Sequence, residues 1–316
     1  MKIRLLIALL AFSCTVHAAY PEKPIRFILP SAAGGSVDIL MRVLTQQLSA
    51  QMGVGFVVEN KPGGAFVPGT MDIVRAAPDG YTLGYGNIVS LAINRSLLPK
   101  LSYDVEKDLT LVSNCVLVFN MLAVSNDLPA RSVQELVAYA KKHPGKLSNG
   151  SSGNGTTGHL GGELFKFMTG TDIVHVPYKG SPQAINDLMA GNIQVMFDNV
   201  PSIGPHAKAG RVRGLGVSAP KRAAQFPDLP TIAEAVPGYE TNSWGGVIGP
   251  AKLPKEIVSR LTDEIRKALA APAVVERYRQ LDTEPDGAGP EAFLELVRKE
   301  TPKWADVVKK SGAKVD

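Results

Sequence analysis

The sequence has 316 residues, of which 45% are hydrophobic and 20% charged, so it is long and apolar enough for about two globular domains. Ordinary numbers of Gly (31) and Pro (23), with only 2 Cys, exclude a collagen, a disordered chain and a disulfide scaffold. The net charge is +5, and two of the positive charges, Lys2 and Arg4, lie in a segment that we expect to be removed. No clustered basic stripe accompanies this small surplus, so we expect no nucleic-acid partner.

Residues 1–18 have the pattern of a secretory signal peptide. A short positive start precedes the apolar run from Leu5 to Phe12, which is too short to span a bilayer as a stable helix. Val16-His17-Ala18 places small residues where a signal peptidase cuts, so we expect cleavage after Ala18 and an exported chain. A rival interpretation makes Cys14 a lipidated residue, but the bulky Phe12 before it suits a lipoprotein signal poorly.

Cys115 is then the only cysteine of the mature chain. A lone thiol cannot form an internal disulfide. It lies in the apolar stretch from Leu111 to Leu122, which favours a buried hydrophobic role over a reactive one.

Strand and helix patterns alternate along the chain, which is typical of α/β layers. Strands are expected at residues 25–29, 56–58, 81–85, 146–148, 173–177, 193–197, 213–217 and 244–248. Helices are expected from Val37 to Gly53, before Ala77, and at 132–143, 158–168, 181–190, 255–271, 272–280 and 290–308. Ser132–Glu135 and Thr231–Glu234 have the spacing of capping boxes.

This order of elements can be drawn as two α/β units. One holds the N-terminal strands and the other the middle strands. The late strand near Trp244 could return to the first sheet, with the C-terminal helices outside it; the order of elements alone does not prove this return, and the family resemblance given below supports it. The chain would then cross between the units near Val124-Ser125 and near Thr241–Ser243, and two crossings make a hinge.

Two loops share one local pattern, in which a strand is followed by small residues and then by a helix. The first is Ser31-Ala32-Ala33-Gly34-Gly35 and the second runs from Ser151 through Asn154-Gly155-Thr156-Thr157. Such loops bring backbone N–H groups and neutral hydroxyl or amide donors close to a ligand, and each ends at a helix N-terminus, which favours an anion. Either loop alone is equally well explained as a tight turn. Two of them at strand carboxyl ends, where open α/β sheets bind ligands, favour binding.

Other polar residues near these loops were considered for chemistry. Ser181 begins a helix and could donate to a carboxylate, whereas Lys179 is expected to be solvated. Asp198 could meet a ligand amine or bond the loop backbone, and we favour the second. Gly153-x-Gly155-x-x-Gly158 matches the dinucleotide fingerprint, but no suitable acidic residue follows, so we reject that cofactor.

Catalytic and metal motifs are weak in this sequence. The histidines after the leader form no H-E-x-x-H or Cys/His cluster, and no G-x-S-x-G elbow occurs. His159 could act as a base with a serine nearby, although a lone histidine is more often structural. We therefore expect no metal, no cofactor and no enzymatic activity.

Several longer motifs together resemble one family, the Bug-type (TctC-like) periplasmic solute-binding proteins of tripartite tricarboxylate transporters. The resemblance covers nearly all of the mature chain. The stretches that carry it are Tyr20-Pro21-x-Lys23-Pro24-Ile25-Arg26, Ala33-Gly34-Gly35-x-x-Asp38, Val58-Glu59-Asn60-Lys61-Pro62-Gly63-Gly64, Ala77-Pro78-Asp79-Gly80-Tyr81-Thr82-Leu83, Ser152-Gly153-x-Gly155-x-x-x-His159-Leu160, Val176-Pro177-Tyr178-Lys179-Gly180 and Met196-Phe197-Asp198-Asn199. Ser36-Val37 departs from the more usual Pro-Thr before Asp38.

The resemblance implies an α/β chain with the type II periplasmic-binding-protein fold, in which two lobes joined by a two-segment hinge close on a small carboxylate. Lobe 1 would hold residues 20–123 plus 243–316, and lobe 2 residues 124–242. The implied ligand-binding residues are Ser31, Ala32, Ala33, Gly34, Gly35, Asn154, Gly155, Thr156, Thr157, Ser181 and Asp198.

The resemblance also implies a function. We expect a periplasmic monomer that captures a di- or tricarboxylate, an amino acid or an aromatic acid and delivers it to the large and small membrane subunits of a transporter. Two alternatives stay open, a ligand-sensing partner of a membrane sensor and an exported hydrolase.

Overall fold

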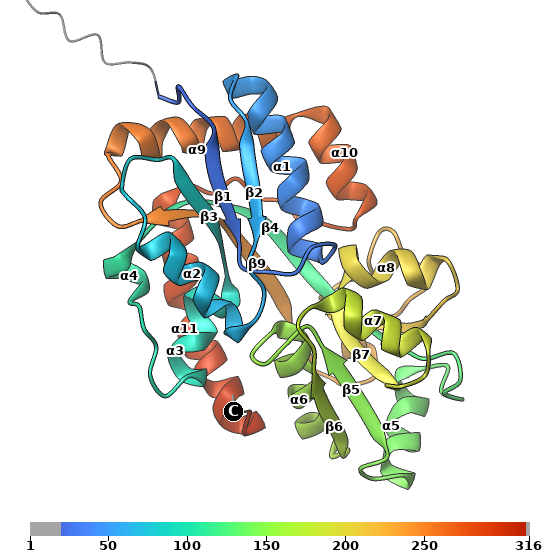
Figure 1. Ribbon diagram of the computed structural model, residues 1–316. Helices are drawn as coiled ribbons and strands as arrows, with labels where there is room; N and C mark the ends of the chain where they lie inside the picture. Colours follow the sequence, from blue (N-terminus) through green and yellow to red (C-terminus); the bar gives the residue numbers. More distant parts are fainter. Residues whose placement is uncertain (1–19, 314–316) are drawn as a thin grey trace, which may run out of the picture.

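The computed structural model describes residues 20–313 (Figure 1). The expected signal peptide, its cleavage after Ala18 and the lipidation of Cys14 lie outside the described residues. Within the described part of the chain, no helix is long and apolar enough to cross a membrane.

The first α/β unit begins with the order strand, loop, helix. Strand β1 (Ile25–Leu29) pairs in parallel with β2 (Phe56–Asn60) and β3 (Thr82–Asn87). Helix α1 (Ser36–Met52) follows β1, and the short η1 (Gly64–Phe66) and α2 (Val67–Val74) follow β2. The late strand β9 (Asn242–Pro250) pairs antiparallel with β3, and so lies in this sheet.

The second unit repeats the order in the middle of the chain. Strand β5 (Leu147–Ser151) pairs in parallel with β6 (Ile173–Pro177) and β7 (Val195–Asn199). Four helices belong to this unit: α5 (Val133–Lys142), α6 (Thr157–Thr169), α7 (Ser181–Met189) and α8 (Val200–Lys208). Strand β8 (Arg213–Val217) and the short η3 (Ile232–Glu234) complete it.

One long strand, β4 (Leu109–Val124), connects the two units. Its residues from Leu109 to Phe119 pair with β9, whereas those from Asn120 to Val124 pair with β7 and β8. The pairing partner therefore changes between Phe119 and Asn120, a few residues before the crossing that we expected at Val124-Ser125. Strand β9 begins at Asn242, opposite Phe119, close to the second expected crossing. The division of the chain into the two stated lobes stays a prediction.

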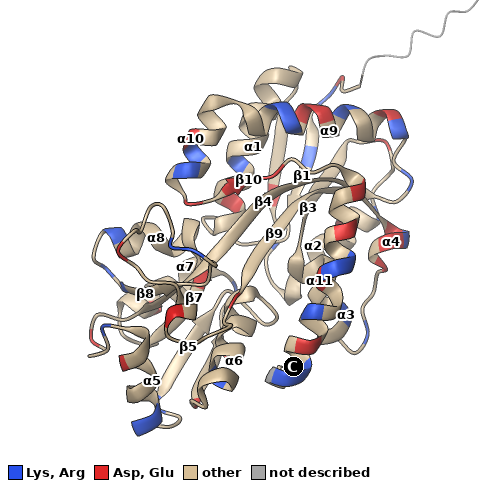
Figure 2. Cartoon of the chain, turned by 180° about the vertical axis from the view of Figure 1, so that it is seen from behind, with Lys and Arg blue, Asp and Glu red and all other residues tan. Residues whose placement is uncertain are grey.

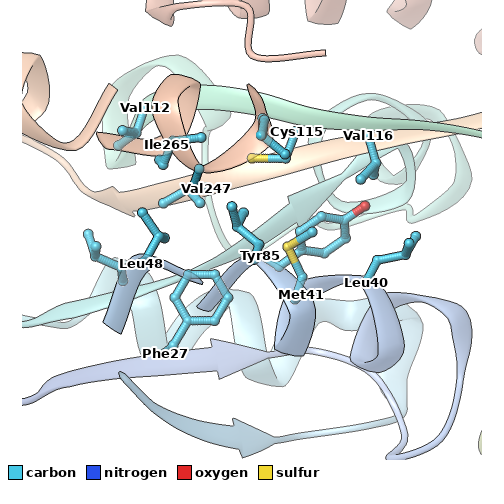
Figure 3. Packing of buried hydrophobic residues seen from close by; sticks show 14 of the residues in the cluster. Phe27, Leu40, Met41, Leu48, Tyr85, Val112, Cys115, Val116, Val247 and Ile265 are labelled. Carbon is cyan, nitrogen blue, oxygen red and sulfur yellow. The ribbon is translucent and has the colours of Figure 1, made fainter. Parts of the chain in front are cut away.

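The first sheet is covered on both faces. On one face, α1, α9 (Lys255–Ala270) and α10 (Pro272–Gln280) pack on the strands, and Figure 3 shows Phe27, Tyr85 and Val247 within this core. Cys115 is fully buried there, which confirms its hydrophobic role, and burial raises the pKa of its thiol to about 12. Each large apolar side chain buried in this way contributes about 1.5–3 kcal/mol.

The other face is covered by α2, by η2 (Val89–Ile93) with α3 (Asn94–Leu97), and by the long α11 (Pro290–Ser311). The short α4 (Val105–Asp108) precedes β4, and β10 (Glu284–Pro285) pairs antiparallel with β4. Positively and negatively charged side chains are mixed along the outer helices (Figure 2) and form ion pairs such as Arg279–Glu276. These exposed pairs contribute little stability individually.

Candidate ligand-binding site

A cavity of about 450 Å³ opens where the carboxyl ends of strands from both units meet. Its volume lies within the range of small-molecule sites. Its wall consists of residues 30–32, 35–37, 62–66, 87, 89, 152–154, 156–157, 177–181, 199 and 243. Residues far apart in the chain thus share one hollow between the units.

The β1–α1 loop supplies one side of this wall. Three of the predicted ligand-binding residues, Ser31, Ala32 and Gly35, line the cavity. Helix α1 has Gly35 at its N-cap without any side-chain cap, and its first intrahelical bond runs from Ile39 N to Gly35 O. The N–H groups of the first turn, beginning with that of Ser36, are therefore left for a bound group.

Ala33 and Gly34 were predicted to contact a ligand, but neither lies on the wall. Gly34 instead shapes the loop, because it adopts φ 77° and donates its N–H to Asp38 Oδ2 at 3.0 Å. Gly34 therefore helps to shape the loop, whereas Ala33 is exposed beside it, and a ligand contact by either residue stays a prediction.

Asp38 holds this loop from behind. Its carboxylate accepts hydrogen bonds from Gly34 N, from Arg42 Nε at 2.9 Å and from Asn60 Nδ2 at 2.9 Å. Burial raises the pKa of Asp38, but the hydrogen bonds from Arg42, Gly34 and Asn60 outweigh it, and the net effect lowers the pKa. Asn60 also donates to Ser31 O, so one carboxylate connects both ends of the loop.

The β5–α6 loop supplies the facing side. The predicted ligand-binding residues Asn154, Thr156 and Thr157 line the cavity, together with Ser152 and Gly153. Thr156 caps α6 by accepting from His159 N, and its hydroxyl donates to Gly153 O at 2.8 Å.

Gly155 was predicted to be a contact residue but lies off the wall. A Cβ at this position would come 2.3 Å from Leu97 Cδ2, so the residue is packed against α3 of the other unit. Its N–H donates to His159 Nδ1 at 3.0 Å.

His159 and His175 form a stacked pair behind this loop. Their ring centroids are 3.8 Å apart, and Ser151 Oγ lies 2.7 Å from His175 Nε2. Burial lowers the pKa of His159 to about 4 and that of His175 to about 3, so both rings are neutral near pH 7. Ser151 is buried and off the cavity wall, so the pair presents no serine nucleophile to the cavity.

Ser181 and Asp198 are hydrogen-bonded to each other, and of the two only Ser181 lies on the cavity wall. Ser181 lines the cavity, and its hydroxyl donates to Asp198 Oδ1 at 2.9 Å. Asp198 lies behind it, and burial raises the pKa of this carboxyl to about 6, against the opposing effect of the Ser181 hydrogen bond. With its hydroxyl proton committed, Ser181 offers a ligand mainly its backbone N–H at the start of α7.

Several wall residues were missed from the sequence. The segment from Pro62 to Phe66 follows β2 with the same Gly-rich pattern as the two recognised loops, so a signal was present. Asn87 and Asn199 end strands, and Ser243 enters the wall only because β9 returns to the first sheet. Lys179 is exposed, as expected of a solvated lysine, and it also lines the cavity.

Ser36 and Asn199 connect the two units across the cavity. Ser36 Oγ donates to Asn199 Oδ1 at 3.0 Å, and Asn199 Nδ2 donates to Asn120 Oδ1 at 2.7 Å. This second bond fixes the amide so that its oxygen faces Ser36.

The electrostatics of the wall favour an anion. Five α-helices have their N-cap residue on it: α1 at Gly35, α2 at Phe66, α6 at Thr156, α7 at Gly180 and α8 at Asn199. Of these, only α6 has a side-chain cap. No Asp or Glu lies on the wall. Among the described residues, no group of three or more His, Cys, Asp or Glu could hold a metal ion.

This chain has two α/β units, a cavity at their strand ends, and the type II fold with a two-segment hinge. It belongs to the class of periplasmic solute-binding proteins. The model of the tripartite tricarboxylate transporter family receptor (TctC) matches residues 40–313, and the chain belongs to this family. Members of the family are periplasmic solute-binding receptors.

Three similar proteins illustrate the match. Protein BugT of Bordetella pertussis is 35% identical over 298 residues, which cover 94% of this chain and 91% of BugT. The structure described as R. palustris Rpa4515 with adipate is 37% identical, with a TM-score of 0.91, and covers 94% of this chain and 100% of that one. MatC (Rpa3494) from Rhodopseudomonas palustris with bound malate is 28% identical, with a TM-score of 0.87 over 92% of this chain and 100% of that one.

Proposed function

We propose that this chain is an exported receptor that captures a small carboxylate by closure of its two lobes and delivers it to the large and small membrane subunits of a tripartite tricarboxylate transporter. The single observation that carries the ligand class is the wall itself. Five α-helix N-termini meet there, and among the described residues no acidic side chain on the wall opposes them.

The interaction free energies available in the cavity are large enough to bind a ligand with micromolar affinity. A helix dipole contributes about 0.3–1 kcal/mol to a nearby anion. A hydrogen bond to a charged group adds about 1.5–3 kcal/mol. A few such bonds from the β1–α1 and β5–α6 loops together exceed the association cost and leave the roughly −8 kcal/mol of a micromolar complex.

The same wall argues against one ligand class that the sequence left open. An α-amino acid carries an ammonium group, which needs a negative or acceptor-rich partner when it is buried. Asp198 was the candidate partner, but it lies behind Ser181. Carboxylates without an amine therefore suit the cavity better, and adipate and malate in the two relatives are of this kind.

The same arrangement supports a role in transport. Ligand bound between the β1–α1 loop and the β5–α6 loop contacts both lobes only when they are closed, so it shifts the population toward the closed form. The membrane subunits would recognise that form. We propose a periplasmic monomer that turns over no substrate.

The test is identification of the ligand. Purified mature protein is denatured, and the released small molecules are identified by mass spectrometry. A thermal-shift panel of mono-, di-, tri- and aromatic carboxylates, amino acids and sugars follows. We expect a carboxylate to raise the melting temperature and to be recovered unchanged after incubation. Stabilisation by sugars or cations alone would refute the proposal.

A further inference from the structure

Among the described residues that line the cavity, Lys179 is the only one with a formal charge. Its side chain makes no ion pair with any described residue, since the ion pairs of this part of the chain all lie elsewhere. Within residues 20–313, this positive charge beside the cavity therefore has no ion-pair partner.

The backbone on both sides of Lys179 is fixed. Tyr178 Oη donates to Asp187 Oδ2 at 2.6 Å, and Tyr178 N donates to Ser151 O at 3.0 Å. On the other side, Gly180 packs so closely on Ala32 of the other unit that an added Cβ would come within 2.4 Å of its Cβ. Lys179 therefore lies at the boundary between the two units, next to the β1–α1 loop.

We infer that Lys179 is a specificity-determining residue that selects a dicarboxylate over a monocarboxylate. This inference rests on the proposed function. The uncapped N-terminus of α1 and the β5–α6 loop hold one carboxylate through neutral donors, and Lys179 pairs with the second.

The charge balance supports a dianion. Neutral N–H and hydroxyl donors can hold one carboxylate by hydrogen bonds, but a second negative group in the same hollow repels the first unless a cation offsets it. One lysine offsets one such charge. A trianion would leave a further charge without a counter-charge on the wall, so two carboxylates match it best.

The test compares diacids and monoacids of equal length. Isothermal titration calorimetry measures the affinity of the C4 to C8 α,ω-dicarboxylates and of the straight-chain monocarboxylates with the same carbon numbers. Wild-type protein is compared with Lys179→Gln and Lys179→Arg. Lys146→Gln is the matched control, because Lys146 is also exposed and in the same unit but is not on the wall.

We expect the wild type to bind its best dicarboxylate at least tenfold more tightly than the matched monocarboxylate. Lys179→Gln should weaken the dicarboxylate about fivefold to tenfold and flatten its salt dependence, because an exposed charge pair is screened by salt. The monocarboxylate should change less than twofold. Lys179→Arg should retain most of the preference, and Lys146→Gln all of it.

The outcomes separate this inference from the proposed function. If carboxylates bind but Lys179→Gln affects both series equally or neither, Lys179 does not select the second carboxylate and the inference is wrong. Preference of the wild type for monocarboxylates overturns it as well. If no carboxylate of any class binds, the proposed function itself fails.

Discussion

Individual residues behind the wall, rather than on it, set the shape of the candidate site. Asp38 holds the β1–α1 loop through three hydrogen bonds, and Asp198 holds the Ser181 hydroxyl. Both carboxylates are buried. In each case a charged group orders neutral donors without facing the cavity itself.

Asp38→Asn should therefore weaken both the fold and the binding of ligand. The amide keeps the shape, but it places N–H donors where Gly34, Arg42 and Asn60 also donate. We expect a loss of about 1–3 kcal/mol in the free energy of unfolding, measured by urea denaturation. Affinity for the best carboxylate should fall about tenfold or more, measured by calorimetry.

Asp263→Asn, which removes an exposed ion pair on α9, provides the control and should change neither quantity measurably. Unaltered affinity in Asp38→Asn would show that the loop keeps its shape without this carboxylate.

The stacked histidines predict a pH dependence of stability. Burial lowers the folded-state pKa of His159 to about 4 and of His175 to about 3, below the ordinary 6.5 of the unfolded chain. Their contribution to stability is fully present above pH 6.5 and is lost as the pH falls toward the folded values, because the unfolded chain binds protons first. Asp198 acts in the opposite direction, since its pKa is raised to about 6 and its protonation favours the folded state.

His175→Gln should reduce the stability lost between pH 7 and pH 5 by roughly 1–2 kcal/mol relative to the wild type. Urea denaturation at both pH values measures it, and His143→Gln at an exposed position is the control. An identical pH dependence in His175→Gln and wild type would contradict a neutral, buried His175.

At the scale of elements, local sequence predicted the strand–loop–helix units well. The small residues after β1 and β5 and the helices that follow them lie where we expected them. Thr231–Glu234 forms the expected capping box, although it begins only the short η3. Ser132 caps α5 through Glu135 N, but Glu135 accepts from Arg131 N instead of completing the box.

The residues that line the cavity were harder to predict, because a residue's place there depends on distant segments that pack against it, and the local sequence does not reveal those segments. Gly155 lies in a loop of small residues typical of ligand contacts, yet Leu97 of the other unit packs against it. Ser243 looks like an ordinary strand residue, and only the pairing of β9 with β3 and β4 brings it to the cavity. Strand β4 was not predicted as a strand, because a continuous apolar run lacks the alternation that marks one.

The loop that begins α7 provides the prediction at this scale. Gly180 has φ 155° and packs on Ala32 across the boundary between the two units, so Gly180→Ala adds backbone strain and also separates the two loops. Gly170→Ala is a matched control, because Gly170 also has positive φ, at 62°, but an added Cβ there meets nothing within 4 Å. Both variants should lose about 1 kcal/mol or more in the free energy of unfolding from backbone strain.

Only Gly180→Ala should weaken ligand binding, by about tenfold or more in calorimetry, because only it obstructs the approach of the two units. Equal affinities of the two variants would mean that the Ala32–Gly180 contact does not contribute to the bound form.

At the scale of the whole molecule, the central feature is that two strands, β4 and β9, connect the units within residues 20–313. Strand β4 changes partner between Phe119 and Asn120, and β9 begins opposite this point. Few backbone bonds would need to change if one unit rotated about this pair. Contacts across the cavity therefore decide how far the closed form is populated without ligand, and the Ser36–Asn199 hydrogen bond is the one with both partners on the wall.

Ser36→Ala should shift the ligand-free protein toward the open form. The bond from Ser36 Oγ to Asn199 Oδ1 joins the two units. We expect it to break when they separate, so that its net contribution of about 0.5–1.5 kcal/mol stabilises the closed form. Small-angle X-ray scattering of the ligand-free variant should give a larger radius of gyration. The affinity for the best carboxylate should fall about twofold to tenfold, since closure then costs more.

Two comparisons keep this prediction specific to closure. Ser259→Ala, at an exposed position on α9, should leave the scattering and the affinity unchanged. Saturating carboxylate should return Ser36→Ala to the compact form of the wild type, because the ligand itself connects the two units. A variant that binds more weakly but scatters like the wild type without ligand would mean that Ser36 contacts the ligand rather than holding the units together.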